Sequence, residues 1–446
     1  MVDCNFLTIS SVCTGETFTL KGSNFPAKGP AVARPASSAD LTIALRDDAA
    51  ALAGQIADLR HRLHREPEVG LDLPRSQEKI LAALDGLGYE ITTGTDTTSV
   101  TAVLRGAAGS NAGESVRPVV LLRGDMDALP VQEKTGLAYA SEVPGAMHGC
   151  GHDLHTAMLV GAANLLASRR DHLSGDVVLM FQPGEEGFDG AGVMIREGVL
   201  DAAGHRPDAA YALHVMSALG DSGAFLSRPG PVMSSSDGLV VTVHGAGGHG
   251  SAPFAAKDPV TVAAEMVLAL QSMVTRQFDV FDPVVISVGM LQAGTKRNVI
   301  PDTARFEATI RSFSAQAKTR LKTSIPRLLG AIAAGHGLEV SVDYIEEYPV
   351  TLNDGAESAF ARHTVEELFG PGRYSELAHP LAGSEDFSRV LAEVPGAFLF
   401  LSAVPEGTDA ATAAYNHSPF AVFDDAVLAD GAALYARLAL DRLASA

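Results

Sequence analysis

A cysteine and a histidine stand two residues apart in the glycine-rich stretch Met147-His148-Gly149-Cys150-Gly151-His152-Asp153. Side chains at positions i and i+2 of extended backbone point the same way, so Cys150 and His152 can face one point in space. A thiolate and an imidazole nitrogen are both good ligands for zinc and neighbouring metals. The glycines let the backbone turn without a Cβ penalty. This pattern alone is a weak signal of a metal site, and residues elsewhere in the chain strengthen it.

Three further residues complete a candidate ligand set: Glu186, His214 and His417. Together with the cysteine and histidine above, they offer nitrogen, oxygen and sulfur donors that suit two divalent ions held close together. A thiolate can bridge two ions, as a carboxylate can. The alternative is that His214 and His417 are ordinary, partly buried histidines. Their acidic neighbours and their position after predicted strands favour the metal site.

Two adjacent carboxylates, Glu185 and Glu186, follow a predicted buried strand. Neighbouring side chains in extended backbone point to opposite sides, so one can bind metal while the other faces a substrate. A metal lowers the pKa of a bound water toward ~7, and a nearby carboxylate can take its proton and deliver it to a leaving amine. We assign Glu186 to the metal and Glu185 to acid/base catalysis. The alternative is a solvated pair at a helix start, where the helix dipole favours negative charge.

Two aspartates, Asp125 and Asp127, share one side of the segment that follows another predicted buried strand. An acid near a metal-bound histidine commonly orients the imidazole by accepting its second N–H, and we expect this role for both. Capping of the next turn is the alternative.

Other site chemistries are less well supported by the sequence. It contains no G-x-S-x-G elbow and no P-loop lysine. Cys150 beside His152 is not the usual arrangement of a nucleophile and its base, which are distant in sequence. A purely structural zinc site usually uses closely spaced cysteine pairs, whereas these candidate ligands are scattered along the chain.

The elements that must position these residues alternate between strand and helix. The predicted elements after helices 40–64 and 75–87 are, in chain order, strands 100–104 and 119–122, helix 154–168, strand 177–181, helix 190–197 and strand 209–213. This alternation is typical of an α/β fold with a mostly parallel sheet. Ligands bind beyond the carboxyl ends of the strands in such sheets, where Asp125, Glu185 and His214 fall.

The pattern changes between residues 229 and 345, where two helices and four strands, several of them alternating, are predicted. They predict a compact α+β domain inserted into the first domain. Its predicted elements are strand 238–243, helix 259–277, strands 284–290 and 303–310, helix 315–334 and strand 339–344. The catalytic domain then comprises residues 40–228 and 346–446, ending in helix 356–369, strand 397–401 and helix 424–443. Residues 1–39 are predicted to be a poorly ordered extension.

The composition restricts the class of partner and the compartment. A formal net charge of -20 over 446 residues argues against nucleic acid, because a phosphate backbone needs a basic surface. Three cysteines do not form a disulfide framework, so we expect a reducing, cytoplasmic location. No apolar run approaches the roughly 20 residues of a membrane span, and we find no secretory signal. A small-molecule substrate is compatible with this charge.

The inserted domain contains two more polar candidates, His249 and Asn298. His249 lies in a literal G-x-G-x-x-G match at residues 245–250, which is a dinucleotide-binding fingerprint when it opens a helix. Pro253 and Pro259 interrupt that position, so nucleotide binding is the weaker interpretation. His249 and Asn298 could instead polarise a substrate carbonyl, or be ordinary loop residues.

Seven motifs together carry a family resemblance: RLHREPE at 62–68, RGDMDALP at 123–130, HGCGHD at 148–153, QPGEEG at 182–187, GGHGSAP at 247–253, NVIP at 298–301 and GSEDF at 383–387. The chain resembles the M20 metallopeptidase family, in the amidohydrolase branch of hippurate hydrolases, N-acyl-amino-acid amidohydrolases and auxin–amino acid conjugate hydrolases. The resemblance covers nearly everything after residue 40. Gly184 stands where the family more often has alanine.

The resemblance implies metal-dependent hydrolysis of an N-acyl or N-aroyl amino acid to a carboxylate and a free amino acid. It implies two divalent ions per subunit (Zn, Mn, Co or Ni) with Cys150 as the bridge, and Glu185 as general acid/base. The inserted domain would be a lid or a dimerisation domain of a homodimer or higher homo-oligomer. His249 would reach a neighbouring active site or stabilise the oxyanion after closure, and Asn298 would contact substrate.

Three alternatives remain open at this point. A dipeptidase and an N-acetyl-diaminopimelate deacetylase of the same fold are the alternatives among hydrolases. A non-catalytic metal- or nucleotide-binding protein is the alternative from another class. A panel of substrates separates the first two from an N-acyl-amino-acid hydrolase, and the absence of any turnover would favour the third.

Overall fold

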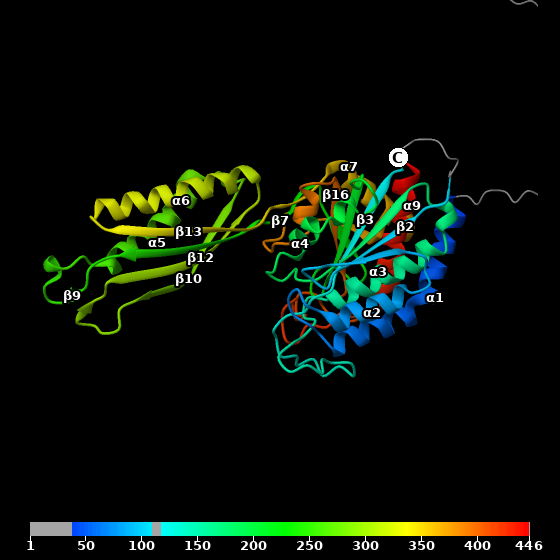
Figure 1. The fold of residues 1–446 in the computed structure, drawn as a ribbon, viewed down its shortest axis with the longest axis horizontal. Coiled ribbons are helices and arrows are strands. Elements are labelled where there is room, and N and C mark those ends of the chain that lie inside the picture. The colour runs from blue at the N-terminus through cyan, green and yellow to red at the C-terminus, as the bar shows by residue number, and fades with distance from the viewer. Residues whose placement is uncertain (1–37, 109–116, 446) are drawn as a thin grey trace, which may run out of the picture.

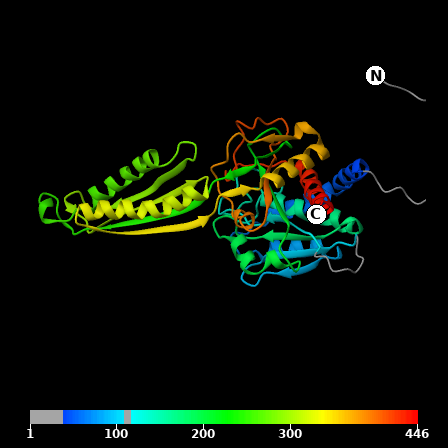
Figure 2. The same cartoon turned by 90° about the horizontal axis from the view of Figure 1, so that it is seen from above.

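The computed structural model describes residues 38–108 and 117–445, so most of the predicted extension 1–39 lies outside the described residues. Figure 1 shows a rounded part built on one large sheet and an elongated part that projects from it. We call the elongated part, residues 236–348, the arm, and the rest of the described chain the body. Figure 2 shows the arm extending away from the body in a second view.

The body is organised around an eight-stranded sheet of order β1-β2-β4-β3-β5-β16-β6-β15. The strands are β1 (Glu90–Thr93), β2 (Val100–Arg105), β3 (Val119–Asp125), β4 (Asp176–Gln182), β5 (Ala209–Met216), β6 (Phe225–Ser227), β15 (Tyr374–Glu376) and β16 (Gly396–Ser402). The four central strands, β4-β3-β5-β16, are parallel to one another. The strands β2 and β6 pair antiparallel with β4 and β16, respectively, and β15 pairs parallel with β6. The predicted α/β class with a mostly parallel sheet is confirmed.

Helices cover both faces of this sheet. One hydrophobic cluster contains residues of α1 (Ser38–Arg65), α2 (Pro74–Leu84), α3 (His152–Ala167), α7 (Gly355–Phe369) and α9 (Leu428–Ala444). The opposite cluster contains residues of α4 (Gly190–Arg196) and α8 (Ser388–Leu391). Leu122 of β3 packs in the first cluster and its neighbour Leu121 in the second. A strand buried on both faces explains why the sequence here is a continuous apolar run.

The arm is a second layered unit. Its antiparallel sheet has the order β10-β12-β8-β13, formed by β8 (Ser236–His244), β10 (Val284–Ala293), β12 (Thr303–Ser312) and β13 (Glu339–Tyr348). Helices α5 (Pro259–Gln277) and α6 (Ala315–Gly335) pack on it through a separate hydrophobic cluster. Burial alternates along β12, because only one face of the sheet is covered. The predicted two helices and four strands are confirmed.

Two pairs of short strands complete the connections. At the junction of arm and body, β7 (Gly230–Met233) pairs antiparallel with β14 (Thr351–Asn353). Within the arm, β9 (Gly248–His249) pairs with β11 (Val299–Ile300). Figure 1 places β9 at the end of the arm farthest from the body.

Several predicted boundaries need correction. Helix α1 begins at Ser38, two residues before the predicted start at residue 40. His214 does not follow its strand but lies within β5, which continues to Met216. The closing helix starts with a 3₁₀ turn at Asp425–Val427 before α9. The short strands β1, β6, β7, β14 and β15 were not predicted, since three- or four-residue segments carry too little periodicity. Of the helices described in residues 38–108 and 117–445, none is both long and apolar enough to cross a membrane.

Candidate metal centre and active site

The five predicted metal ligands lie together at the carboxyl ends of the central strands, with His214 inside strand β5 near its end. The Sγ atom of Cys150 is 3.4 Å from Nε2 of His214 and 3.3 Å from Nε2 of His417. Nε2 of His417 is also 3.0 Å from Oε1 of Glu186. Because β3, β4 and β5 run parallel, residues that are distant in sequence meet at this one edge of the sheet.

A glycine in left-handed backbone sets the position of the Cys150–His152 pair. Gly151 has φ 82° and immediately precedes α3. A Cβ atom at Gly151 would lie 2.3 Å from Cγ2 of Val215, so no other residue fits without a shift. The predicted extended backbone between Cys150 and His152 is wrong, since His152 is the first residue of α3, but their donor atoms still lie within 4.8 Å of each other.

His417 also has a left-handed backbone, with φ 71°, which is uncommon for a residue other than glycine. Its peptide N–H donates to the Gly149 carbonyl at 2.8 Å. The preceding Asn416 accepts hydrogen bonds from both the backbone N–H and the hydroxyl of Ser217, each at 2.9 Å. Strained backbone that is held by its surroundings is typical of functional positions.

Two groups of donor atoms share the Cys150 thiol. One is Cys150, His152 and His214, and the other is Cys150, Glu186 and His417; the donor atoms of each group lie within 4.8 Å of one another. Nε2 of His152 is buried and has no hydrogen-bond partner among the described residues. Buried polar atoms normally have a hydrogen-bond partner, so this unpartnered nitrogen is suited to bind a metal ion. The residues present therefore fit two divalent ions that share a thiolate.

Asp127 connects two of the candidate ligands. Its Oδ1 is 3.3 Å from Nδ1 of His152, and its Oδ2 accepts a hydrogen bond from the Glu186 N–H at 3.1 Å. This contact agrees with the predicted orienting role, because it leaves Nε2 of His152 free for a metal.

Asp125 acts mainly on a different histidine, His155. Its Oδ1 is 2.5 Å from Nδ1 of His155, whereas its nearest distance to His152 is 3.5 Å. Nε2 of His155 accepts the Val215 N–H at 2.7 Å, and Arg123 pairs with Asp125 at 2.7 Å. His155 was not among the sequence candidates. Its position three residues after His152 on a helix, hence on the same face, was the available signal.

Glu185 lies beside the ligand cluster in a nearly closed environment. Its side chain is buried, and its carboxylate is within 4.8 Å of donor atoms of His152 and Glu186. Burial raises the pKa of Glu185 well above its usual value, and the charges of Glu385 and Glu186 raise it further. A carboxyl group with a raised pKa can act as an acid as well as a base.

His417 is the most exposed member of the cluster. Hydrogen bonds to the Cys150 thiol and to Glu186 raise the pKa of His417 to about 10. Metal ligation needs the neutral imidazole, so binding of an ion at this residue releases a proton.

The cluster opens into a cavity of about 540 Å³. Apolar side chains line part of it, namely Met216, Met233, Leu381 and Phe400. The arm contributes a cation, Arg311 of β12, whose Nη1 donates to the Ser384 hydroxyl at 3.1 Å. Arg311 was not among the sequence candidates, because nothing in its local sequence links it to residues of the body.

His249 and Asn298 do not line this cavity. They lie together at the far end of the arm, where the Gly250 N–H donates to the Asn298 carbonyl at 2.9 Å. His249 is exposed, and its Nδ1 is 2.8 Å from the Ser251 hydroxyl. Within one chain, the structure therefore separates these two predicted site residues from the ligand cluster.

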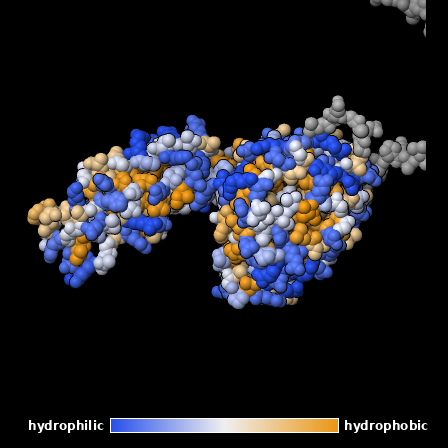
Figure 3. All heavy atoms as spheres, viewed as in Figure 1, coloured by the Kyte–Doolittle hydropathy of each residue, from blue (hydrophilic) through white to orange (hydrophobic). Residues whose placement is uncertain are grey.

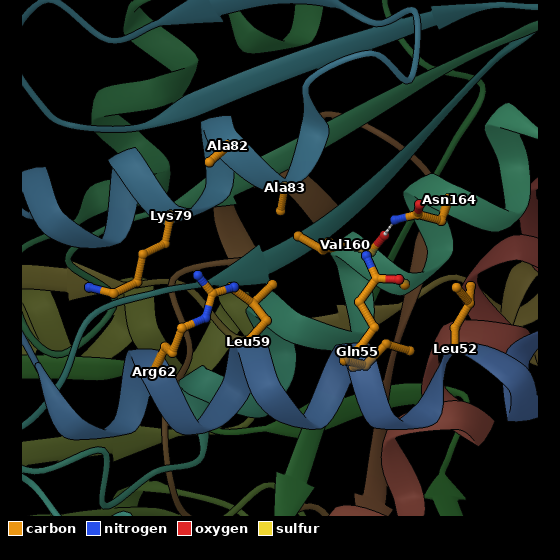
Figure 4. Close-up of a pocket in the computed structure, with 11 residues that line it drawn as sticks. Leu52, Gln55, Leu59, Arg62, Lys79, Ala82, Ala83, Val160 and Asn164 are labelled. Carbon is orange, nitrogen blue, oxygen red and sulfur yellow. Dashed lines mark hydrogen bonds between the residues drawn. The ribbon is translucent and has the colours of Figure 1, made fainter.

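A second cavity, of about 210 Å³, lies between α1, α2 and α3 (Figure 4). Its walls are largely apolar, and the polar side chains at its edge include Arg62, Lys79 and Asn164. The Asn164 amide donates to the Val160 carbonyl at 2.9 Å, which is a bond within α3. None of the candidate metal ligands lines this second cavity, so it is not the candidate active site.

A family model described as peptidase family M20/M25/M40 matches residues 121–441. The chain belongs to this family. It is 35% identical to thermostable carboxypeptidase 1 of Saccharolobus solfataricus, over 90% of this chain and 98% of that protein. It is 36% identical to hippurate hydrolase of Campylobacter jejuni, over 88% of this chain and 97% of that protein.

A solved M20 structure agrees with the metal interpretation. It is a dinuclear metal-binding peptidase of Bacillus subtilis, 30% identical in sequence, with a TM-score of 0.75 over 89% of this chain and 99% of that chain. The fold of this M20 enzyme is thus shared with a protein that binds two metal ions.

Proposed function

We propose that this M20 enzyme hydrolyses the amide bond of N-acyl or N-aroyl amino acids to a carboxylate and a free amino acid. The observation that carries the proposal is one cavity lined by four of the five candidate ligands, the buried Glu185 and the cation Arg311, with the fifth ligand, His152, beside Cys150 and His214. The similarity to hippurate hydrolase, which by its name hydrolyses an N-aroyl amino acid, supports the substrate class.

Cys150, His152, Glu186, His214 and His417 would hold two divalent ions, with Cys150 between them. Such ions supply Lewis-acid activation of the amide carbonyl and of a water molecule. The donor set suits Zn, Mn, Co or Ni. Asp127 would keep His152 in the orientation that presents Nε2 to the ion.

Glu185 would move the proton. Its buried carboxylate accepts the proton of the attacking water and then donates it to the leaving amide nitrogen, so that the amine departs neutral. The raised pKa makes the Glu185 carboxylate a stronger base toward the attacking water. Asp125 would act indirectly, by fixing His155 against β5.

Arg311 would bind the carboxylate of the amino acid part of the substrate. It brings a guanidinium into a cavity otherwise rich in carboxylates, and a guanidinium matches a carboxylate with two parallel hydrogen bonds. The apolar side chains Met233, Leu381 and Phe400 would receive the acyl or aroyl group.

Residues 229–345 would form a dimerisation or lid domain that includes most of the arm. Large hydrophobic side chains are exposed on it, among them Leu268, Val285 and Leu291, and Figure 3 shows a hydrophobic patch over the middle of the arm. Exposed apolar patches mark interaction surfaces. In a homodimer, His249 and Asn298 would complete the partner's active site; a closing lid would bring them to their own. A reducing cytoplasmic location remains our expectation for the free thiol of Cys150.

Elemental analysis paired with an activity panel tests the proposal. We expect about two ions per chain and amine release from hippurate and N-acetyl amino acids, lost on chelation and restored by Mn, Zn, Co or Ni. Faster hydrolysis of dipeptides or of N-acetyl-diaminopimelate would favour those alternatives. A folded protein that takes up none of these ions would contradict the ligand assignment.

A further inference from the structure

Tyr348 connects the arm to the loop that carries Glu185 and Glu186. It is the last residue of β13 and is buried, with 6% of its surface exposed. Its hydroxyl donates a hydrogen bond to the Glu185 carbonyl at 2.9 Å and accepts one from the Asp189 N–H at 3.3 Å. One phenol oxygen thus holds both ends of the segment 185–189.

This segment depends on such outside contacts. It follows β4 without regular structure, and Gly184, Gly187 and Asp189 have φ values of 70°, 84° and 57°. A Cβ atom at Gly184 would lie 2.5 Å from the Leu71 side chain, and its left-handed backbone also favours glycine. Asp189 is strained as a non-glycine residue in left-handed backbone, and Arg389 pairs with its carboxylate.

Tyr348 itself is fixed to the arm. It pairs with Ser236 in the register of β13 and β8. Its carbonyl accepts from the Lys318 ammonium at 3.2 Å, and Lys318 pairs with Asp237 at 2.5 Å. The tyrosine backbone therefore moves with the sheet of the arm, while its hydroxyl contacts the body.

We infer that Tyr348 is a positioning residue whose hydroxyl fixes the backbone at Glu185 and so places the carboxyl group for proton transfer. This inference rests on the proposed role of Glu185. Proton transfer requires hydrogen-bond distance, so a small displacement of the carboxyl group slows the reaction strongly. Substrate binding, in contrast, would use Arg311 and the apolar wall of the same cavity, whereas the hydroxyl is hydrogen-bonded to the backbone of Glu185 and Asp189.

The test compares Tyr348→Phe with Tyr344→Phe in the full-length protein. Tyr344 lies on the same strand, and its hydroxyl donates to Asp237 inside the arm at 2.9 Å, so the control also loses one hydroxyl bonded to an acceptor. Three quantities are measured: kcat and KM on the best substrate of the panel, metal content, and amide hydrogen exchange of residues 184–190 in the metal-free protein.

Tyr348→Phe should lower kcat by about 10- to 100-fold, with KM changed less than about threefold and metal content equal to the wild type. Exchange in residues 184–190 should accelerate about fivefold through loss of the hydrogen bonds, and Tyr344→Phe should change neither quantity. Wild-type exchange or wild-type kcat in Tyr348→Phe would overturn the inference, as would an equal loss of kcat in both variants. Exchange in the metal-free protein reports on the contact whether or not the substrate panel succeeds, which separates failure of this inference from failure of the proposed function.

Discussion

The sheet of the body and the sheet of the arm differ in how many of their faces are covered. Every residue of β3, β4 and β5 is buried, because helices pack on both sides. Along β12 of the arm, buried and more exposed residues alternate, because α5 and α6 pack on one side alone. A polar side chain can leave the doubly covered sheet at the strand ends, and the ligand cluster lies there.

The two kinds of sheet suit two different functions, a buried reactive site and a contact surface. Strand ends of a doubly covered sheet converge in a place shielded from water, which suits buried donors and a carboxyl group with a raised pKa. A sheet covered on one side keeps a face and two edges free, which suits contact with another surface. The arm accordingly has exposed apolar residues on its surface. It also contributes the cation Arg311 to the lining of the cavity.

The largest effect is expected at Glu185, which follows the carboxyl end of β4 in the body. Glu185→Gln should lower kcat by about 10²–10⁴-fold, since proton transfer is lost while the shape of the side chain is kept. Metal content should stay at the wild-type value. Glu406→Gln, at an exposed glutamate, is the matched control and should have wild-type activity. Wild-type rates in Glu185→Gln would assign proton transfer to another group.

A smaller loss is expected at the tip of the arm. His249→Ala should lower kcat by about 10²–10³-fold if the imidazole stabilises the oxyanion. Mixing this variant with Glu185→Gln then distinguishes the two models. Exchange of subunits in a twofold dimer restores about a quarter of the sites when His249 acts on the partner, because half of the dimers are mixed and each has one intact site. A lid that closes on its own chain gives no recovery.

Substitutions at two neighbouring positions of β3 test directly whether helices cover both faces of the body sheet. Leu121→Ala and Leu122→Ala should each lower the free energy of unfolding by about 2–5 kcal/mol, since each leaves a cavity in a different cluster. Urea unfolding followed by circular dichroism measures both. A loss confined to one of the two would mean that only one face of the sheet is packed.

Milder substitutions at two neighbouring positions of β12 should give unequal effects. Ile310 is buried against the helices of the arm, and Ile310→Val should cost about 0.5–1.5 kcal/mol. Its neighbour Thr309 is exposed, and Thr309→Ala should stay within about 0.5 kcal/mol of the wild type. Equal losses at the two positions would indicate that another surface covers the outer face of this sheet.

Local features of the sequence accounted for much of the fold. The predicted helix 259–277 matches α5, because Asp258 caps it and Pro259 fits its first turn. Convergence of the five ligands was also predictable, since parallel strands bring their carboxyl ends to one edge. Arg311 and Tyr348 could not be found this way. They enter the site from the arm, and their role depends on how two units pack, which no local pattern encodes.

The junction between arm and body has a consequence for engineering. Met233 of β7 and Thr351 of β14 are opposite each other in an antiparallel pair. A two-residue turn commonly joins strands in this arrangement. The arm could therefore be deleted and the gap closed by a hairpin, or exchanged for the corresponding part of a relative, with the eight-stranded sheet left uninterrupted. Such chimaeras would show which properties follow the arm and which stay with the eight-stranded sheet.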